Sequence, residues 1–190
     1  MSKVIIHATV SVDGFMADVD GSVAWMNGFP VAPEDEDLVG RVVQELGAVV
    51  CGANKTQTIE PGEIPYGGTL GVPMYLMTHS AHEPIEKDGI TYTFVVDDIR
   101  QAVESAKRAA GDKAVSLLGG TISRQCLELG LVDEIQLHVV PIILGEGISL
   151  FGGLSELIRL ERVETAAFAG EVHLRYRIPA ETKISAASLG

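Results

Sequence analysis

Two adjacent glycines lie where an apolar segment gives way to a helical pattern. The segment from Ala114 to Leu118 is typical of a buried strand, Gly119 and Gly120 follow it, and a helical pattern then runs to Gly130. Backbone amides and the dipole at a helix start favour anions, and residues without a Cβ let a phosphate approach the main chain. The pattern predicts a phosphate-binding turn. The alternative is a plain strand-to-helix turn, because the full glycine-rich dinucleotide motif is not present.

A second turn of the same kind lies earlier in the chain. The apolar residues Val49–Cys51 lead to Gly52, after which Asn54 or Thr56 can cap a short helix and Lys55 can pair with a phosphate. A solvated lysine beside a helix cap would give the same pattern. Two such turns support each other, because α/β proteins bind ligands where the carboxyl ends of strands open into a crevice.

Acidic side chains offer candidates for proton transfer. Asp13 follows the first apolar segment, where it either faces a bound molecule or forms a turn with Gly14. Four acidic residues, Glu34 to Asp37, open a predicted helix, where carboxylates also stabilise the helix dipole without any catalytic role. His79 follows another predicted strand and can donate to a phosphate or a ribose, unless it is simply an exposed loop residue.

The sequence shows no metal site and no nucleophile motif. No two histidines are paired at metal-ligand spacing on one helix; they are His7, His79, His82, His138 and His173. Cys51 and Cys126 lie among apolar residues and are expected to be buried, unreactive thiols. No metal is therefore predicted.

Strand and helix signals alternate through the first two-thirds of the chain, and strands dominate the last third. The predicted strands are Val4–Val10, Ala48–Cys51, Val72–Thr78, Ile90–Val96, Ala114–Leu118, Glu134–Val140, Leu157–Glu164 and Glu171–Ile178. Helices are predicted from Pro33 to Gly47, near Thr56, after Asp97 or Asp98, and from Gly120 to Gly130. The last strand alternates, so His173 and Arg175 are expected on a solvated face. These elements predict one mixed, mostly parallel α/β sheet with an antiparallel C-terminal part, flanked by helices.

Length and charge narrow the classes of function. The 190 residues fit one domain, expected over residues 1–179, with a loose, small and polar tail over residues 180–190. A net charge of −12 and a pI of about 4.7 oppose binding to nucleic acid or an anionic membrane, but local donors can still hold an anionic small molecule. There is no signal-peptide pattern and no apolar stretch of membrane-spanning length, so the cytoplasm is expected.

Four segments in order resemble the reductase domain of riboflavin biosynthesis and its dihydrofolate reductase-like relatives. They are Ser11–Ala17 (SVDGFMA), Leu118–Thr121 (LGGT), Gly130–Glu134 (GLVDE), and Pro141–Gly147 (PIILGEG) with Leu150 and Phe151. The match runs over nearly the whole chain. The resemblance implies a dihydrofolate reductase-like fold, NADPH as hydride donor, and a homodimer.

The resemblance also implies a set of cofactor-binding residues. The diphosphate would lie at Gly119, Gly120 and Thr121, and at the helix start after Gly52, which is formed by Asn54, Lys55 and Thr56. The adenosine ribose and its 2′-phosphate would contact Thr78, His79 and Ser80. The nicotinamide amide would be held at Ala8 and Thr9. The family usually reads Gly-Arg-x-Thr at the helix start, where this chain has Ala53 and Asn54. With that arginine replaced, the choice of NADPH over NADH has less support.

On the substrate side, Asp13 matches the aspartate of the family's Ser-x-Asp-Gly motif. The basic residue that commonly follows in riboflavin reductases is Phe15 here, which weakens the match to a ribose-phosphate substrate. Trp25 and Asp37 resemble the tryptophan and the acid that hold the pterin in dihydrofolate reductases, and this match can shift to Glu34 or Glu36.

The implied reaction is hydride transfer to an electrophilic C=N or C=O carbon of a pteridine- or pyrimidine-type small molecule, with Asp13 or Asp37 helping a proton to reach nitrogen or oxygen. Two alternatives stay open. One is a genuine dihydrofolate reductase, and the other is a nucleotide-binding dimer without turnover.

Overall fold

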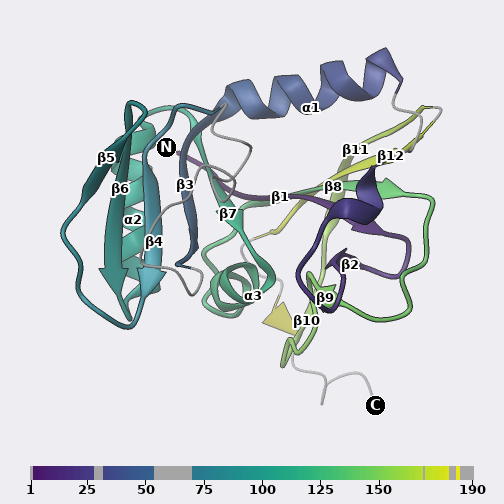
Figure 1. The fold of residues 1–190 in the computed structure, drawn as a ribbon. Coiled ribbons are helices and arrows are strands. Elements are labelled where there is room, and N and C mark those ends of the chain that lie inside the picture. The colour runs from purple at the N-terminus through teal and green to yellow at the C-terminus, as the bar shows by residue number, and fades with distance from the viewer. Residues whose placement is uncertain (1, 28–31, 54–69, 169, 180–182, 185–190) are drawn as a thin grey trace.

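The computed structural model describes residues 2–27, 32–53, 70–168, 170–179 and 183–184, which form a nine-stranded sheet with helices on both faces (Figure 1). The strand order is β11-β12-β8-β1-β7-β3-β4-β6-β5. The strands are β1 (Val4–Ser11), β3 (Leu46–Gly52), β4 (Met74–Thr78), β5 (Ile85–Lys87), β6 (Ile90–Val96), β7 (Ala114–Leu118), β8 (Glu134–Val140), β11 (Glu161–Ala167) and β12 (Val172–Arg177).

The six strands from β8 to β6 run parallel, and those at the two ends of the sheet are antiparallel. β5 pairs antiparallel with β6, while β12 and β11 add an antiparallel hairpin next to β8. The central strands are mostly apolar because both of their faces are covered. This arrangement confirms the predicted mixed sheet with its antiparallel C-terminal part.

Two helices share one face of the sheet and the third covers the other. α2 (Ile99–Ala110) and α3 (Gly120–Glu128) pack into one core cluster with Val4, Ile6 and Val115. α1 (Pro33–Glu45) packs on the opposite face against Ile5, and Figure 1 shows α1 and α3 on opposite sides of β1 and β7. No helix among the described residues is long and apolar enough to span a membrane.

The helix ends follow the sequence signals. Pro33 opens α1, and the Asp98 side chain caps α2 by accepting a hydrogen bond from the Gln101 amide at 2.9 Å. α3 is followed by Gly130, whose φ of +69° suits glycine. Gly47 does not terminate α1 as predicted but lies inside β3, where a Cβ would come within 2.7 Å of the Lys113 Cβ.

Two predictions about the C-terminal third are wrong. The single strand expected over Leu157–Glu164 is split into β10 (Leu157–Ile158), which pairs with β13 (Lys183–Ile184), and the longer β11. The polar face of β12 was expected to be solvated, but His173 is only 4% exposed. That face lies beneath α1, which the alternation along one strand cannot reveal.

Short elements complete the described structure. β2 (Phe15–Ala17) pairs with β9 (Ile148–Ser149), and the 3-10 helix η1 (Ala24–Met26) precedes α1. The helix predicted near Thr56 lies outside the described residues. Within the expected tail, residues 183–184 form β13, and the other tail residues lie outside the described part. Cys51 and Cys126 are free and buried, and burial raises the pKa of each thiol to about 12, which confirms the prediction of inert thiols.

Candidate active site

The carboxyl ends of neighbouring parallel strands gather most of the predicted cofactor residues at one edge of the sheet. β1, β7, β3 and β4 are adjacent in that order and parallel, so their last residues share an edge. The described residues predicted for the cofactor lie on β1 or at these strand ends: Ala8, Thr9, Gly52, Thr78, His79, Ser80, Gly119, Gly120 and Thr121. Asn54, Lys55 and Thr56 lie outside the described residues.

The turn between β7 and α3 has a backbone that requires glycine. Gly119 has a φ of +96° and caps α3 without a side-chain hydrogen bond. A Cβ on Gly120 would lie 2.7 Å from the carbonyl oxygen of Ser149, so the close approach of that loop already explains this glycine. Thr121 is exposed at the first turn of α3. The start of α3 therefore has no side-chain cap, and Thr121 is exposed there.

The turn after β4 combines polar groups with acidic neighbours. The Ser80 amide donates to Thr78 Oγ1 at 3.2 Å, and His79 Nδ1 donates to Asp97 Oδ1 at 2.6 Å. Both members of the His79–Asp97 pair are exposed. His79, in the segment predicted for the 2′-phosphate, therefore already has a carboxylate partner.

Asp13 holds two loops together. It accepts hydrogen bonds from Ser11 Oγ at 2.6 Å, from the Gly145 amide at 2.7 Å and from the Leu144 amide at 3.2 Å. The Ser11 bond first, then the two amides, hold the pKa of Asp13 below its usual value. This carboxylate therefore fastens the loop after β1 to the loop after β8.

α1 turns Asp35, rather than Asp37, toward the sheet. Asp35 is 1% exposed, whereas Asp37 lies on the solvent side. Residues two apart on a helix point about 200° apart, so only one of them can face the sheet. Asp35 shares its face with Leu38 and Val42, which pack on Ile5. Trp25 in η1 is half-buried, and its buried Nε1 has no hydrogen-bond partner among the described residues.

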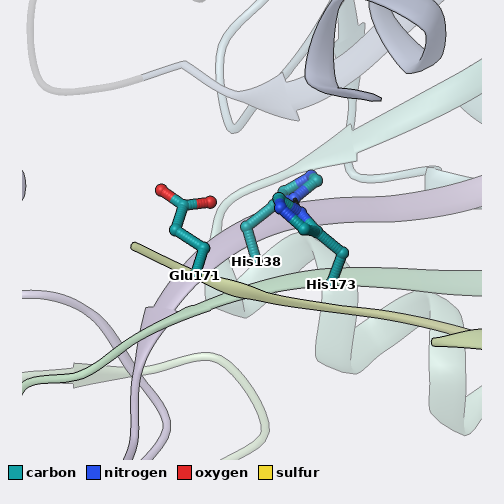
Figure 2. Close-up of side chains that lie close together, drawn as sticks. All are labelled: His138, Glu171 and His173. Carbon is teal, nitrogen blue, oxygen red and sulfur yellow. Dashed lines mark hydrogen bonds between the residues drawn. The ribbon is translucent and has the colours of Figure 1, made fainter. Parts of the chain in front are cut away.

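Asp35 ends a continuous row of buried polar groups, which we call the buried histidine line: Asp35, His173, His138 and His7. His173 Nε2 donates to Asp35 Oδ1 at 2.7 Å, the Nδ1 atoms of His173 and His138 lie 2.5 Å apart, and the Nε2 atoms of His138 and His7 lie 2.6 Å apart. None of the four residues is more than 8% exposed. Figure 2 shows the His138 and His173 rings side by side, rising from neighbouring strands.

Burial fixes the charges along this line. It lowers the pKa of His7 to about 4 and that of His138 to about 3, the latter aided by its two histidine neighbours. Burial alone would raise the pKa of Asp35, but the hydrogen bonds from His173 and the Ala32 amide hold it below the usual value. At neutral pH the line therefore contains a carboxylate at one end and neutral rings at His138 and His7.

The same face of the sheet continues into an ion-pair network around a buried carboxylate and a small cavity. Glu134, 2% exposed, accepts from Lys3 Nζ at 2.6 Å and from Arg175 Nε at 2.9 Å. Burial would raise the pKa of Glu134, but these two cations hold it low. A cavity of about 90 Å³ between α1 and strands β8, β12 and β11 is lined by Leu38, Arg41, Val42, Glu45, Gln136, Leu137, His138, Glu164, Ala166, His173, Leu174 and Arg175.

Sequence reasoning did not identify the buried histidine line. Its histidines come from three strands that are distant along the chain, so no local spacing marks them. Asp35 did leave a signal, because it lies three and seven residues before Leu38 and Val42 and thus extends the apolar stripe of α1 backwards.

Comparisons with known proteins assign the chain to a family. It has the fold of the dihydrofolate reductase-like reductases of riboflavin biosynthesis. The sequence profile of the RibD C-terminal domain matches residues 70–174. The chain belongs to this family.

Individual proteins are similar to this chain over most of its length. The Bacillus subtilis (strain 168) protein YyaP is 29% identical over 178 residues, which cover 90% of this chain and 91% of that protein. A putative riboflavin biosynthesis protein from Shewanella sp. PV-4 superposes with a TM-score of 0.73 at 19% identity, covering 94% of this chain and 99% of that one. The Thermotoga maritima diaminohydroxyphosphoribosylaminopyrimidine deaminase/5-amino-6-(5-phosphoribosylamino)uracil reductase gives a TM-score of 0.65 at 15% identity, covering 94% of this chain and 57% of that one.

Proposed function

We propose that this protein is an NADPH-dependent reductase that transfers hydride to a pteridine- or pyrimidine-type small molecule. The observation that carries the proposal is the shared edge of β1, β7, β3 and β4, where the uncapped start of α3 lies at the end of a central strand. Membership of the RibD C-terminal family supports the reaction class, and the name of the Thermotoga protein supports a pyrimidine-type substrate.

The residues at this edge fit a dinucleotide diphosphate. The first amides of α3 carry no side-chain cap, Gly119 adds no Cβ, and the helix dipole favours an anion. Gly119 and Thr121 would hold the diphosphate, and the β1 backbone at Ala8 and Thr9 would hold the nicotinamide amide. When bound, the cofactor supplies the hydride, while this chain aligns the reactants and excludes water.

The dihydrofolate reductase alternative has less support. The resemblance to dihydrofolate reductases implies an acid from α1 that is open to the substrate, whereas the inward-facing acid, Asp35, already accepts from His173 within a buried line. Asp13 and Asp37 stay predictions for the proton-transfer acid. Their positions, one bonded to a loop and one on the solvent side of α1, give neither an advantage.

The function is tested by titrating the protein with NADPH and, in parallel, NADH, and then following oxidation of the reduced nicotinamide with a panel of pteridines and pyrimidines that includes dihydrofolate. We expect saturable NADPH binding and oxidation with at least one pyrimidine or pteridine. Binding without oxidation across the panel would favour the non-catalytic alternative, and oxidation restricted to dihydrofolate would favour the dihydrofolate reductase alternative.

Thr121→Asp tests the cofactor site without disturbing the turn. Because an acid in the first turn suits the helix dipole, stability should be kept, while the new charge repels the diphosphate. We expect NADPH affinity to fall at least tenfold, about 1.4 kcal/mol. Thr121→Asn is the matched neutral control and should bind almost normally. Equal affinity for both variants would remove α3 from the site.

A further inference from the structure

Two histidines and a glutamate rise from one patch of the sheet, close to the start of α1. His138 on β8 and His173 on β12 are direct cross-strand partners. Glu171 lies two residues before His173, and side chains two apart along an extended chain share a face. Figure 2 shows all three side chains standing on the same side, with the Glu171 carboxylate beside the rings. One nitrogen of each ring and one carboxylate oxygen all lie within 4.8 Å of one another.

The ring nitrogens that face each other are the two Nδ1 atoms, which lie 2.5 Å apart. This separation is below the roughly 2.7 Å lower limit of hydrogen bonds donated by N–H groups. An ion with metal–nitrogen bonds of about 2.0 Å holds two such atoms about 3.3 Å apart in a tetrahedral site, so the rings need to separate by about 0.8 Å. Both rings line the 90 Å³ cavity, which gives them room to rotate by this amount.

The other nitrogen of each ring is already held by a second group. His173 Nε2 donates to Asp35 Oδ1 at 2.7 Å, and His138 Nε2 lies 2.6 Å from His7 Nε2. Histidines that bind a metal through one nitrogen donate the other N–H to a carboxylate or another acceptor, which fixes the orientation of the ring. The Asp35–His173 pair has this arrangement, and the His7 ring can accept from His138 in the same way.

Two carboxylates flank the rings, and neither is paired with a Lys or Arg side chain among the described residues. Asp35 is 1% exposed and accepts from His173. The Glu171 side chain has no hydrogen bond or ion pair with the part of the chain that the structure describes, and burial raises its pKa. The neighbouring cation, Arg175, is bound to Glu134. Because buried charges are paired or coordinate metals, a cation between the rings and Glu171 would balance this patch.

We propose that His138 Nδ1, His173 Nδ1 and the Glu171 carboxylate bind one divalent transition-metal ion of the zinc class, with a water from the cavity as the fourth ligand. Two imidazoles and one carboxylate form a ligand set that zinc takes in sites with an open position, whereas Mg²⁺ prefers oxygen ligands. The ion forms bonds to two nitrogens and one oxygen, and no group is oxidised or reduced. The proposal does not depend on the reductase function.

The cavity gives the ion a path to its ligands. The charged residues that line it, Arg41, Glu45 and Glu164, are exposed, so the cavity is open to solvent. The sequence predicted no metal because no two histidines share a helix at ligand spacing. The cross-strand pair of His138 and His173 forms only when β12 adds to β8, and no local spacing reveals it.

Zinc titration of the chelator-treated, full-length chain tests the site, with a coloured zinc chelator as competitor. We expect one zinc ion per chain that excess Mg²⁺ does not displace. Co²⁺ bound in its place should give the visible absorption of a four- or five-coordinate site with nitrogen and oxygen ligands. Substoichiometric binding at saturating zinc, or displacement by Mg²⁺, would overturn the proposal.

Variants locate the ion. Glu171→Gln keeps the size of the side chain but removes the charged ligand, so zinc affinity should fall at least tenfold. Asp35→Asn keeps an oxygen for His173 Nε2–H but removes its charge, and should weaken binding by about tenfold to a hundredfold. His82→Gln, which removes a histidine outside the site, should bind zinc like the wild type. Equal affinity in all three variants would place the ion elsewhere and overturn the site.

The ring nitrogens are observed directly in the wild-type chain labelled with ¹⁵N-histidine, by long-range ¹H–¹⁵N correlation spectra. Without zinc, His173 carries its hydrogen on Nε2, so the contact between the rings requires the hydrogen of His138 on Nδ1. With zinc, both rings should become Nε2–H forms with shifted Nδ1 signals. Zinc that leaves these two rings unchanged would overturn the proposal, even if a variant does not fold. NADPH binding and turnover are measured separately, so a failed reductase proposal leaves this result standing.

Discussion

At the scale of single residues, the partners of a carboxylate decide its role more than its place in a motif. Asp13 has the position of the family aspartate, yet three donors occupy its oxygens and lower its pKa. A carboxylate stabilised in this way is a weak base and a poor source of protons at neutral pH. Asp35 lacks a motif of its own, but it is buried and accepts a hydrogen bond from the His173 ring.

Asp13→Ala should release the loop after β8. Without the carboxylate, the Leu144 and Gly145 amides lose their acceptor, so their hydrogen exchange should accelerate at least tenfold, measured residue by residue by NMR. Asp18→Ala removes another loop carboxylate, which accepts from the Asp20 and Ser22 amides, and should leave Gly145 unchanged. Unchanged Gly145 exchange in Asp13→Asn, together with a loss of turnover of about a hundredfold, would instead support the predicted catalytic role.

At the scale of elements, the sequence predicted what is local and periodic. The strands around Val4–Val10 and Ala114–Leu118, the helix opened by Pro33 and the helix capped by Asp98 are confirmed because each carries its own apolar period or cap. The single strand predicted over Leu157–Glu164 was wrong because the two-residue β10 and the start of the seven-residue β11 lie in different sheets but look like one strand in the sequence. His173 was placed on the solvated face because the covering helix, α1, lies far away in the sequence.

Because His7 and His138 are buried, the free energy of unfolding should depend on pH in mild acid. Their pKa values, about 4 and about 3, lie below the 6.5 of the unfolded chain, so the unfolded state binds more protons over this interval. Stability is therefore complete above pH 6.5 and falls as the pH drops toward 4, by about 3 kcal/mol from His7 alone.

Urea unfolding at pH values from 7 to 4.5 measures this effect. In His7→Phe, which keeps an apolar ring on β1, the slope of unfolding free energy against pH should become shallower. Replacement of the half-buried His82 by Gln serves as the control and should keep the full slope. A wild-type stability that is flat from pH 6.5 to 4.5 would contradict the burial of these two rings.

At the scale of the whole molecule, the C-terminal half presents apolar surface suited to a second copy of the chain. Ile143 is 73% exposed in the loop after β8, and Ile148 is 43% exposed in β9, whereas Leu150 is buried. A protein–protein interface would bury such side chains. The homodimer expected from the family resemblance stays a proposal.

Light scattering at micromolar concentration should give the mass of a dimer, twice the 20.2 kDa of one chain. Ile143→Lys, which places a charge in the proposed interface, should shift the mass toward the monomer. Val19→Lys, at a residue that is 62% exposed elsewhere, should not. A monomeric wild-type chain would disprove the homodimer, and a dimer that both variants retain would place the interface elsewhere.

The way the buried histidine line is assembled also has a consequence for biosynthesis. His7 and Asp35 are near the start of the chain, His138 follows more than a hundred residues later, and His173 joins only with β12, close to the end. A nascent chain on the ribosome can form β1 and α1 early, but Asp35 has no ring to pair with until β12 has been translated and added beside β8. Long-range closure of this kind is slow. The line is therefore complete only when the chain is nearly complete, and a fragment that lacks β12 would lack the donor to Asp35.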